Sequence, residues 1–473
     1  MESSVELKID LARSPAPRRF WVRTFGCQMN LHDSEKVENL LLHDGYQAAR
    51  DAEDADLLIV NTCSIREKAE HRLYSDLGLL RSWKEALPGR VLGVGGCVAQ
   101  QEGDALLLRF PQVDFVFGTH NLRLVPALAL AAGEGRRAVR TEERRSLDRF
   151  ELPVPHPELT RKNPGRAYLT VMEGCDLFCS FCIVPTTRGR EISRPAEAIV
   201  REAELLAKRG VRELVLLGQT VNAYGRHDAR RKRGEATGTV PFGELLRRLA
   251  ELPGISRIRY TSPHPIFFDD DLIAAHGALP ALCPHVHLPV QSGSDAVLRA
   301  MRRRYCRDDY LRLVEQLRGA RADLALTTDL IVGFPGETDQ DFEDTLALAR
   351  EVGFVDSYSF KYSPRPGTPA ATLEATQGIP EPVKQARLEA LQDLQRSLTL
   401  SAHRARVGTR TEILLDGESR RGGQLAGRDP YQRVVNLSTK SPGGLAPGRL
   451  VPVEIVEATP HSLLAEPAAP LPD

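Results

Sequence analysis

The sequence predicts an α/β protein in which two parallel-sheet domains precede a small all-β domain. Three observations lead to this prediction. Near the N-terminus, three strand–helix units each place a cysteine just after the strand, which predicts an open α/β domain. In the centre, six strand–helix units alternate, which predicts a parallel sheet curled into a partial (β/α)6 barrel. Near the C-terminus, short alternating strands with glycine-rich turns predict a small β-barrel.

The length of the chain indicates several domains. At 473 residues, the chain is too long for one ordinary domain. We expect the N-terminal α/β domain over residues 19–140, the partial barrel over residues 166–400 and the C-terminal barrel over residues 403–470. The stretch over residues 141–166 is polar and contains several prolines, which is typical of a linker.

Charge, hydropathy and cysteine content exclude some classes of protein. The chain has 63 basic and 63 acidic residues, so its net charge gives no overall attraction to nucleic acid. It has no run of about 18 apolar residues and no apolar signal region at its N-terminus. We therefore expect a cytoplasmic protein with no membrane contact. Eight cysteines in so long a chain are too few for a disulfide scaffold.

The N-terminal domain is predicted from three strands that each end near a cysteine. We expect these strands at Phe20–Phe25, Asp56–Val60 and Arg90–Val94. A helix is expected after the first strand, with Asp33 or Ser34 as its N-cap. The cysteines that follow the strands are Cys27, Cys63 and Cys97. Because ligand sites of open α/β sheets form outside the carboxyl ends of the strands, these cysteines can converge on one ligand. Three unrelated buried thiols are the alternative.

A second set of three cysteines lies within one loop. The loop follows an expected strand at Ala167–Met172 and carries Cys175, Cys179 and Cys182. Closed zinc and iron–sulfur sites have four ligands, so three thiolates leave one metal position open. An open, thiolate-held metal position directly after a strand indicates catalysis. The alternatives are a zinc knuckle or three ordinary buried cysteines.

The other loops of the expected barrel are rich in glycine, proline and hydrogen-bonding side chains. They follow strands expected at Glu213–Leu217, Arg257–Thr261, His285–Leu288, Ala325–Val332 and Asp356–Tyr362. Such loops build the ligand site of a parallel barrel, so they are consistent with a cofactor pocket. We interpret His264 as a hydrogen-bonding loop residue, Cys283 and Cys306 as non-ligands, and the basic segment Arg226–Arg233 as solvated.

The C-terminal barrel has a local excess of positive charge. Between Arg404 and Arg449 the sequence has nine basic and four acidic residues, an excess of five. With Tyr431 among these arginines, the barrel suits contact with an RNA backbone. An ordinary solvated surface is the alternative.

Six stretches carry a resemblance to a known family, from about Phe20 to Leu464. They are Thr24–Asn30, Asn61–Ala69, Gly95–Glu102, Met172–Cys175, Leu288–Ser294 and Ser363–Thr368. In these stretches the chain resembles the MiaB-like tRNA methylthiotransferases, which are radical S-adenosylmethionine enzymes. Thr186 and Thr220 depart from the family pattern, which has a tyrosine and an asparagine at these positions.

The resemblance implies a methylthiotransferase domain, a radical S-adenosylmethionine barrel and a C-terminal TRAM domain that binds RNA. It also implies two [4Fe–4S] clusters, so that six cysteines are metal-binding and catalytic. One cluster would be held by Cys175, Cys179 and Cys182, and an auxiliary cluster by Cys27, Cys63 and Cys97. By position in the barrel and by family likeness, the residues expected to bind S-adenosylmethionine are Phe181, Gly218, Gln219, Gln291, Gly333 and Glu337.

The implied reaction converts N6-isopentenyladenosine at position 37 of tRNA to its 2-methylthio form. One S-adenosylmethionine would methylate a sulfur on the auxiliary cluster. A second would yield the radical that removes hydrogen from C2 of the adenine. The expected partners are the tRNA anticodon loop and an electron donor such as flavodoxin or ferredoxin, and we expect a monomer. The sulfur donor and the preferred tRNAs do not follow from the sequence.

Two alternative functions are consistent with the same sequence. A sibling methylthiotransferase would act on threonylcarbamoyladenosine in tRNA or on an aspartate side chain of a ribosomal protein, although the stretch Ser64–Ala69 favours the isopentenyl branch. A protein of another class would be a non-catalytic RNA-binding protein with a structural metal. Against it stand the two sets of three cysteines, each of which leaves a metal position open.

Overall fold

The computed structural model describes residues 18–64, 67–144, 146–162, 164–227, 238–419, 422–438 and 445–468. Several residues that enter the sequence predictions lie outside these ranges: residues 1–17, Ile65, Arg66, most of Arg226–Arg233, Arg420, Arg421 and Lys440. The chain divides into two units, Met1–Glu142 and Glu143–Asp473. None of the described helices has the length and apolar composition that crossing a membrane requires.

The first unit is built on a parallel sheet of six strands in the order β2-β1-β3-β4-β5-β6. The strands are β1 (Arg19–Phe25), β2 (Gln47–Ala48), β3 (Leu57–Thr62), β4 (Val91–Gly96), β5 (Phe115–Phe117) and β6 (Ala138–Arg140). The helices are α1 (Gln28–His43), α2 (Glu67–Ala86), α3 (Cys97–Glu102), α4 (Asp104–Arg109) and α5 (Val125–Gly133). The predicted open α/β architecture is confirmed.

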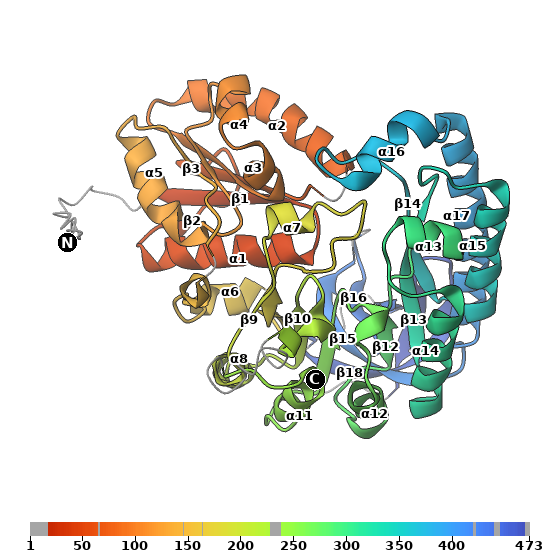
Figure 1. Cartoon of the computed structure of the whole chain (residues 1–473). Coiled ribbons are helices and arrows are strands. Elements are labelled where there is room, and N and C mark those ends of the chain that lie inside the picture. Colours follow the sequence, from red (N-terminus) through yellow and green to blue (C-terminus); the bar gives the residue numbers. More distant parts are fainter. Residues whose placement is uncertain are drawn as a thin grey trace. The chain divides into compact units, whose positions relative to one another are not determined.

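Both faces of this sheet are buried, because alternate side chains of β3 pack into different apolar clusters. Leu58 and Val60 pack with residues of α2 in one apolar cluster, whereas Leu57 and Ile59 pack with residues of α1 and α5 in another. Figure 1 shows α2 on one side of the sheet and α1 on the other. A strand covered on both faces reads as a continuous apolar run, which is why β3 was predictable.

The start of α1 differs from the prediction. The helix begins at Gln28 and its N-cap is Cys27, so Asp33 and Ser34 lie inside the helix, where both are buried. The Ser34 hydroxyl accepts hydrogen bonds from Thr24 Oγ1 at 2.7 Å and from Asn61 Nδ2 at 2.9 Å. A tertiary hydrogen-bond network therefore uses the side chain that local capping preferences assigned to a helix start.

The second unit contains six parallel strands in sequence order. These are β7 (Arg166–Thr170), β10 (Glu213–Leu217), β11 (Arg257–Tyr260), β12 (His285–His287), β13 (Ala325–Val332) and β14 (Asp356–Lys361). They form two sheets of three strands, β7-β10-β11 and β12-β13-β14. An isolated bridge pairs Ile258 of β11 with Leu282, which precedes β12 in the chain. The predicted parallel sheet system is confirmed, with a break in its middle.

Helices and short elements connect these strands. The helices are α6 (Pro157–Lys162), α7 (Val184–Thr187), α8 (Ala196–Lys208), α11 (Phe242–Ala250), α12 (Asp270–Ala278), α13 (Asp295–Ala300), α14 (Arg307–Ala320), α15 (Asp339–Val352), α16 (Pro369–Gln377) and α17 (Glu381–Arg404). A two-stranded ribbon of β8 (Met172–Glu173) and β9 (Ile192–Ser193) frames the cysteine loop. One continuous apolar core joins both three-stranded sheets to their helices.

The C-terminal part of this unit is a closed five-stranded barrel, as predicted. Its strands are β15 (Arg410–Glu418), β16 (Leu425–Arg428), β17 (Val434–Leu437), β18 (Leu450–Ala458) and β19 (Leu463–Pro467). The sequence predicted strands at Thr411–Leu415, Arg433–Leu437 and Leu450–Val456, but neither β16 nor β19. Their sequences, Leu-Ala-Gly-Arg and Leu-Leu-Ala-Glu-Pro, contain residues that are depleted in strands, and only pairing with neighbouring strands makes them strands.

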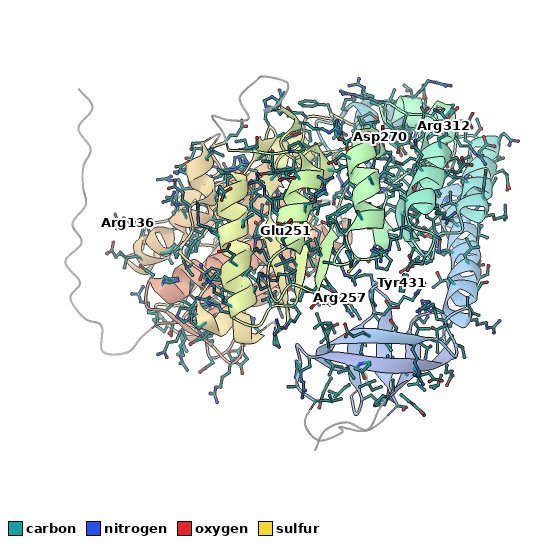
Figure 2. All side chains as sticks on the ribbon, turned by 90° about the horizontal axis from the view of Figure 1, so that it is seen from below. Arg136, Glu251, Arg257, Asp270, Arg312 and Tyr431 are labelled. Atoms are coloured by element: carbon teal, nitrogen blue, oxygen red, sulfur yellow. The ribbon has the colours of Figure 1, made fainter. Side chains whose placement is uncertain are left out.

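Arginines fix this small barrel to the amino-terminal ends of β7, β10 and β11. Arg257 donates to the carbonyl oxygens of Arg428 and Glu412 at 3.0 and 2.6 Å. Arg259 donates to the carbonyl oxygens of Pro430 and Asp429, both at 2.8 Å. Figure 2 shows the barrel next to Arg257, with Tyr431 at the same seam. The backbone of the barrel is thereby held by charged donors.

A buried carboxylate holds these arginines in place. Glu213, at the start of β10, is 0% exposed, and its oxygens lie 2.7 Å from Arg166 Nε and 3.3 Å from Arg259 Nε. Burial alone would raise the pKa of Glu213, but Arg259, Arg166 and Arg257 together hold it below its ordinary value. Glu213 is therefore ionised and neutralises a group of arginines that would otherwise repel one another.

We expect Glu213→Gln to loosen this seam. Removing one charge of a buried ion pair costs about 3–5 kcal/mol, because the remaining charges are left without a partner. Hydrogen–deuterium exchange should become faster in peptides covering β16 and β17. Glu412→Gln is the matched control, since Glu412 also pairs with Arg257 but its side chain is 48% exposed. Equal exchange in Glu213→Gln and the unsubstituted protein would contradict this role.

Acid is expected to destabilise the second unit through His276 on α12. His276 Nε2 lies 2.6 Å from Tyr260 Oη, and burial, with the nearby Arg321, lowers the pKa of His276 to about 4. The unfolded chain takes up a proton below about pH 6.5, and the folded chain does so only near pH 4. The free energy of unfolding should therefore fall by about 1.4 kcal/mol per pH unit across this window.

His276→Gln tests this assignment, because glutamine takes up no proton. Urea unfolding should be followed by far-UV circular dichroism, since both tryptophans, Trp21 and Trp83, belong to the first unit. The variant should lose less stability than the unsubstituted protein between about pH 6.5 and pH 4. The same pH dependence in both proteins would mean that His276 does not carry the effect.

Candidate functional site

The three cysteines of the first unit lie at the carboxyl ends of three adjacent strands. The register pairs Phe25 of β1 with Thr62 of β3, and Thr62 with Gly96 of β4. Cys63 and Cys97 directly follow the last residues of β3 and β4, and Cys27 follows β1 by two residues. The sheet therefore brings together three thiols that are far apart in the sequence, as the sequence predicted.

Contact among these thiols affects the pKa of Cys63. Hydrogen bonding to the thiols of Cys27 and Cys97, together with burial, raises the pKa of Cys63 well above its ordinary value. None of the eight cysteines of the chain forms a disulfide. Metal ligation requires thiolates, so a metal bound here would displace protons that the closely spaced thiols otherwise keep.

Two glycines make this close approach possible. Gly26 has φ +134°, and a Cβ added there would lie 2.3 Å from the Cβ of Cys63. Gly96 has φ +95°, and a Cβ added there would lie 2.3 Å from Asn61 Oδ1. Real Cβ atoms cannot come so close to their neighbours, so both loops need glycine to bring the cysteines together.

Sequence reasoning assigned no role to the amide network behind these thiols. The Cys27 thiol donates to Asn30 Oδ1 at 3.3 Å, and Asn30 Nδ2 donates to Asn61 Oδ1 at 3.2 Å. Asn61 Nδ2 donates in turn to the carbonyl oxygen of Asn30 at 2.9 Å. Both asparagines are buried, and they belong to the stretches that carry the family resemblance. The family resemblance was therefore the sequence feature that could have indicated a role for Asn30 and Asn61.

The cysteine loop of the second unit lies between β8 and α7 and is anchored at several points. Gly174 has φ +82°, and its N–H donates to Gln219 Oε1 in the loop after β10. A Cβ at Gly174 would lie 2.1 Å from the carbonyl oxygen of Arg190. Ser180 donates from its N–H to the carbonyl oxygen of Met301 at 3.0 Å and from its hydroxyl to that of Ala300 at 2.7 Å. These contacts fix the loop to two neighbouring βα loops.

Two of the three sulfur atoms in this loop have side-chain hydrogen-bond partners. Thr220 Oγ1 lies 3.1 Å from Cys175 Sγ, and Arg303 Nη1 donates to Cys179 Sγ at 3.4 Å. Thr220 is one of the two departures from the family pattern. Hydrogen bonds from a surrounding shell of residues orient metal ligands and tune the metal that they hold.

Cys175 and Cys182 resist ionisation. Burial is the largest cause that raises the pKa of Cys175, and burial with the neighbouring Cys179 raises the pKa of Cys182 to about 12. Both groups are therefore protonated at neutral pH until a metal displaces the proton. Among the described residues, no three His, Cys, Asp or Glu side chains are grouped to hold a single metal ion.

Of the predicted S-adenosylmethionine residues, Phe181 lies in the cysteine loop, and Gly218 and Gln219 lie beside it. Gln219 contacts it directly through Gly174, and Gly218 precedes Gln219 at the end of β10. A Cβ at Gly218 would lie 2.6 Å from Met172 Cγ, so glycine is needed for packing there. Phe181 is partly buried and packs against the apolar cluster that contains Phe334 and Tyr362.

The other three predicted residues follow β12 and β13. Gln291 has φ +78° and donates its N–H to the carbonyl oxygen of Asp329 at 2.9 Å. Gly333 donates its N–H to Glu337 Oε2 at 2.7 Å, and Arg387 Nη1 binds the same oxygen at 2.7 Å. The carboxylate of Glu337 therefore holds the loop after β13 together.

His264, after β11, behaves as a buried loop residue. Its backbone N–H and carbonyl oxygen are both bonded by the side chain of Asn222, at 2.9 and 3.0 Å. Burial, with Arg303 and Arg304 nearby, lowers the pKa of His264 to about 2, so the imidazole is neutral. Its Nδ1 accepts a hydrogen bond from the N–H of Ile266 at 3.4 Å. These contacts agree with the hydrogen-bonding role expected from the sequence.

The two remaining cysteines have other surroundings. Cys306 is the N-cap of α14, and its backbone N–H and thiol donate to Asp309 Oδ2 at 3.0 and 3.1 Å. Cys283 is 3% exposed, and burial raises its pKa. Neither lies in the cysteine loop.

Tyr431 and two of its arginines lie at the seam between the small barrel and the large barrel. Arg406 and Arg433 lie over the Tyr431 ring at 4.8 and 4.7 Å, and Tyr431 Oη donates to Asp323 Oδ2 at 2.7 Å. Asp323 belongs to the large barrel, so this aromatic residue is part of the seam. Arg410, whose side chain is 76% exposed, is one of the arginines of the small barrel that remain accessible.

Three family models match the chain in succession. Residues 19–118 match a model described as uncharacterized protein family UPF0004. Residues 169–349 match the radical SAM superfamily, and residues 404–468 match the TRAM domain. The first match contains Cys27, Cys63 and Cys97, and the second contains the whole cysteine loop of the second unit.

Solved structures with a similar fold are radical S-adenosylmethionine enzymes. One is the methyltransferase TsrM from Kitasatospora setae, with cobalamin and a [4Fe–4S] cluster bound, at 15% identity and TM-score 0.56, covering 75% of this chain and 74% of that chain. Another is the cobalamin-dependent enzyme OxsB with aqua-cobalamin and S-adenosylmethionine bound, at 11% identity and TM-score 0.50, covering 79% of this chain and 56% of that chain. At such identities the likeness shows the fold.

These findings establish the general chemistry of the chain. Residues 169–349 form a radical SAM domain, and the chain is an enzyme. Enzymes with such a domain use a [4Fe–4S] cluster and S-adenosylmethionine.

Proposed function

We propose, on the premise that the order UPF0004, radical SAM and TRAM is characteristic of the methylthiotransferases, that this enzyme methylthiolates tRNA. The substrate would be N6-isopentenyladenosine at position 37, modified at C2 of the adenine. The observation that carries the proposal is the presence of two separate sets of three thiols. One lies in the radical SAM domain and the other lies at the sheet edge of the UPF0004 domain.

The residues of the cysteine loop fit a [4Fe–4S] cluster with one open iron. Cys175, Cys179 and Cys182 would hold three irons, and the amino and carboxylate groups of S-adenosylmethionine would bind the fourth. A cluster of four irons spaces its ligands more widely than one ion, because each sulfur binds a different iron. When bound, cluster and S-adenosylmethionine supply the one-electron chemistry that yields a 5′-deoxyadenosyl radical.

The surrounding loops would position S-adenosylmethionine. Phe181, Gly218, Gln219, Gln291 and Gly333 all follow strand ends on the side of the sheet that carries the cysteine loop. Glu337 would act indirectly, because its carboxylate already binds Gly333 and Arg387. The half-buried Phe181 and the glycines would leave room for a flat adenine and exclude water.

Cys27, Cys63 and Cys97 would hold the auxiliary cluster that handles sulfur. Support comes from their contact with one another and from the two glycines that allow it. Three thiolates again leave one iron open, which a sulfur to be methylated could occupy. A non-catalytic metal protein would not need two such incomplete ligand sets.

The small barrel would bind the RNA, as TRAM domains suggest. The target base would have to leave the anticodon loop, and bases in single-stranded loops are the RNA bases that proteins can reach. Electrons would come from a flavodoxin or ferredoxin, and the protein would act as a monomer in the cytoplasm.

Metal content and RNA analysis together test the proposal. The anaerobically reconstituted chain should contain about eight irons, and the variant with Cys27, Cys63 and Cys97 changed to Ala about four. Mass spectrometry of tRNA nucleosides from a strain lacking the protein should show loss of the 2-methylthio form and accumulation of N6-isopentenyladenosine. Complementation with the triple variant should not restore the product.

Other outcomes would point to the alternatives. Unchanged isopentenyl nucleosides, with loss of methylthiolation of threonylcarbamoyladenosine or of a ribosomal-protein aspartate, would indicate a sibling enzyme. Bound zinc without cleavage of S-adenosylmethionine would indicate the non-catalytic protein. About four irons in both chains would remove the auxiliary cluster from the proposal.

Gly26→Ala is expected to lower the iron content toward that of the triple variant. The new methyl group would overlap the Cβ of Cys63, so Cys27 and Cys63 could not keep their separation. Gly45→Ala is the matched control, because Gly45 also has positive φ (+87°) but has no atom within 4 Å of an added Cβ. Iron bound to Gly45→Ala should stay at the level of the unsubstituted chain. Full iron content in Gly26→Ala would argue against a cluster at these cysteines.

A further inference from the structure

Arg303 is a buried cation directed at the cysteine loop. It lies between α13 and α14 and is 6% exposed. Its guanidinium donates from Nη1 to Cys179 Sγ at 3.4 Å, from Nη2 to the carbonyl oxygen of Pro289 at 2.9 Å, and from Nε to Tyr305 Oη at 3.1 Å. All three of its nitrogens therefore have a partner, and one of these partners is a sulfur atom.

The backbone around Arg303 has an unusual conformation. Arg302 and Arg304 have φ values of +59° and +60°, in the left-handed region that residues other than glycine rarely adopt. Both neighbours are exposed, and Arg303 between them is buried. Strained residues of this kind cost about 1 kcal/mol or more each and cluster at functional sites. The two left-handed residues thereby direct the side chain of Arg303 into the protein, while Arg302 and Arg304 stay exposed.

Arg303 has no carboxylate partner among the described residues. Other buried arginines do: Arg387 pairs with Glu337 at 2.7 Å, and Arg259 pairs with Glu213 at 3.3 Å. The acidic groups that act on Arg303 are the phenol of Tyr305 and the thiol of Cys179. A buried charge is costly without an opposite charge, and a cluster held by the Cys179 sulfur, which Arg303 contacts, would supply one.

Tyr305 keeps the guanidinium in place. Its hydroxyl, which accepts from Arg303 Nε, donates to the carbonyl oxygen of Val290 at 2.8 Å. The edge of its ring meets His264, with the ring centres 5.5 Å apart. Arg303 is thus positioned by two loops of the barrel, and it cannot turn away from Cys179 without leaving these hydrogen bonds unmade.

We infer that Arg303 sets the reduction potential of the cluster at Cys175, Cys179 and Cys182. The inference rests on the cluster ligands given under the proposed function. Reduction adds one electron, and thus one negative charge, to the cluster and its thiolates. A fixed positive charge and a hydrogen bond to one sulfur stabilise the reduced form more than the oxidised form, which raises the potential. Arg303 is a positioning residue, because it acts through Cys179.

The test is a potentiometric titration followed by electron paramagnetic resonance. It uses the full chain with Cys27, Cys63 and Cys97 changed to Ala, so that one cluster gives the signal. Arg303→Gln should shift the midpoint to a more negative potential. We expect the ratio of reduced to oxidised cluster at a given potential to fall about tenfold, which is about 59 mV for one electron. Arg303→Lys, which keeps the charge but not the planar fork, should shift it less.

Arg304→Gln is the matched control. Arg304 is the next residue and also contacts the cysteine loop, where Nη2 donates to the carbonyl oxygen of Leu177 at 3.4 Å, but it is exposed and bonds no sulfur. Its midpoint should equal that of the parent chain. An equal shift in Arg303→Gln and Arg304→Gln would overturn the inference, because a general loss of charge would then explain both.

Iron content separates the remaining outcomes. About four irons in Arg303→Gln with the midpoint of the parent chain would overturn the inference. Loss of iron from both Arg303→Gln and Arg303→Lys would also overturn it, since the arginine would then only shape the loop. If only Arg303→Gln loses iron, Arg303→Lys decides: a more negative midpoint supports the inference, and an unchanged one overturns it. Iron retained after Cys175, Cys179 and Cys182 are changed to Ala would instead show that the cluster ligands were wrongly assigned.

Discussion

The register of parallel strands is the constraint on which the candidate sites depend. In a parallel sheet all strands end at the same edge, so residues just after the strands meet there whatever their distance in the sequence. In the first unit this rule brings Cys63 and Cys97 beside Cys27, and glycines remove the atoms that would keep them apart. In the second unit, the same rule places residues that contact the cysteine loop at one edge of the sheet. Gln219 and Arg303 reach that loop from different βα connections.

The opposite edge of the large barrel is also held by specific hydrogen bonds. There Arg257 and Arg259, whose charges Glu213 helps to neutralise, donate to backbone carbonyl oxygens of the small barrel. A backbone carbonyl group accepts such a bond whatever the side chain of its residue. The seam therefore restricts the position of the small barrel, and it restricts the amino-acid sequence there much less. Tyr431 is used in the same seam. Any RNA bound by the small barrel must therefore use side chains that point away from the seam, such as Arg410.

The sequence predicted those features that a local pattern can express. Apolar runs such as Leu57–Val60 predicted buried parallel strands, and cysteines after strand ends predicted both thiol groups. Features that depend on distant contacts were missed. Serine is a common N-cap residue, but the Ser34 hydroxyl accepts a hydrogen bond from Asn61 instead. β16 is a strand only because it pairs with β15. Nothing in the spacing links Arg303 to Cys179, which lies 124 residues away, because the link depends on two left-handed residues.

The two thiol groups differ in the charge of the residues that support them. Behind Cys27 lie the neutral amides of Asn30 and Asn61, whose donors and acceptors are used in mutual hydrogen bonds. Beside Cys179 lies the guanidinium of Arg303. Because a buried cation favours added negative charge and a neutral amide pair does so much less, two clusters of one type held at these sites would differ in potential. The group in the radical SAM domain is then the one better suited to accept an electron, which is the step that its chemistry requires.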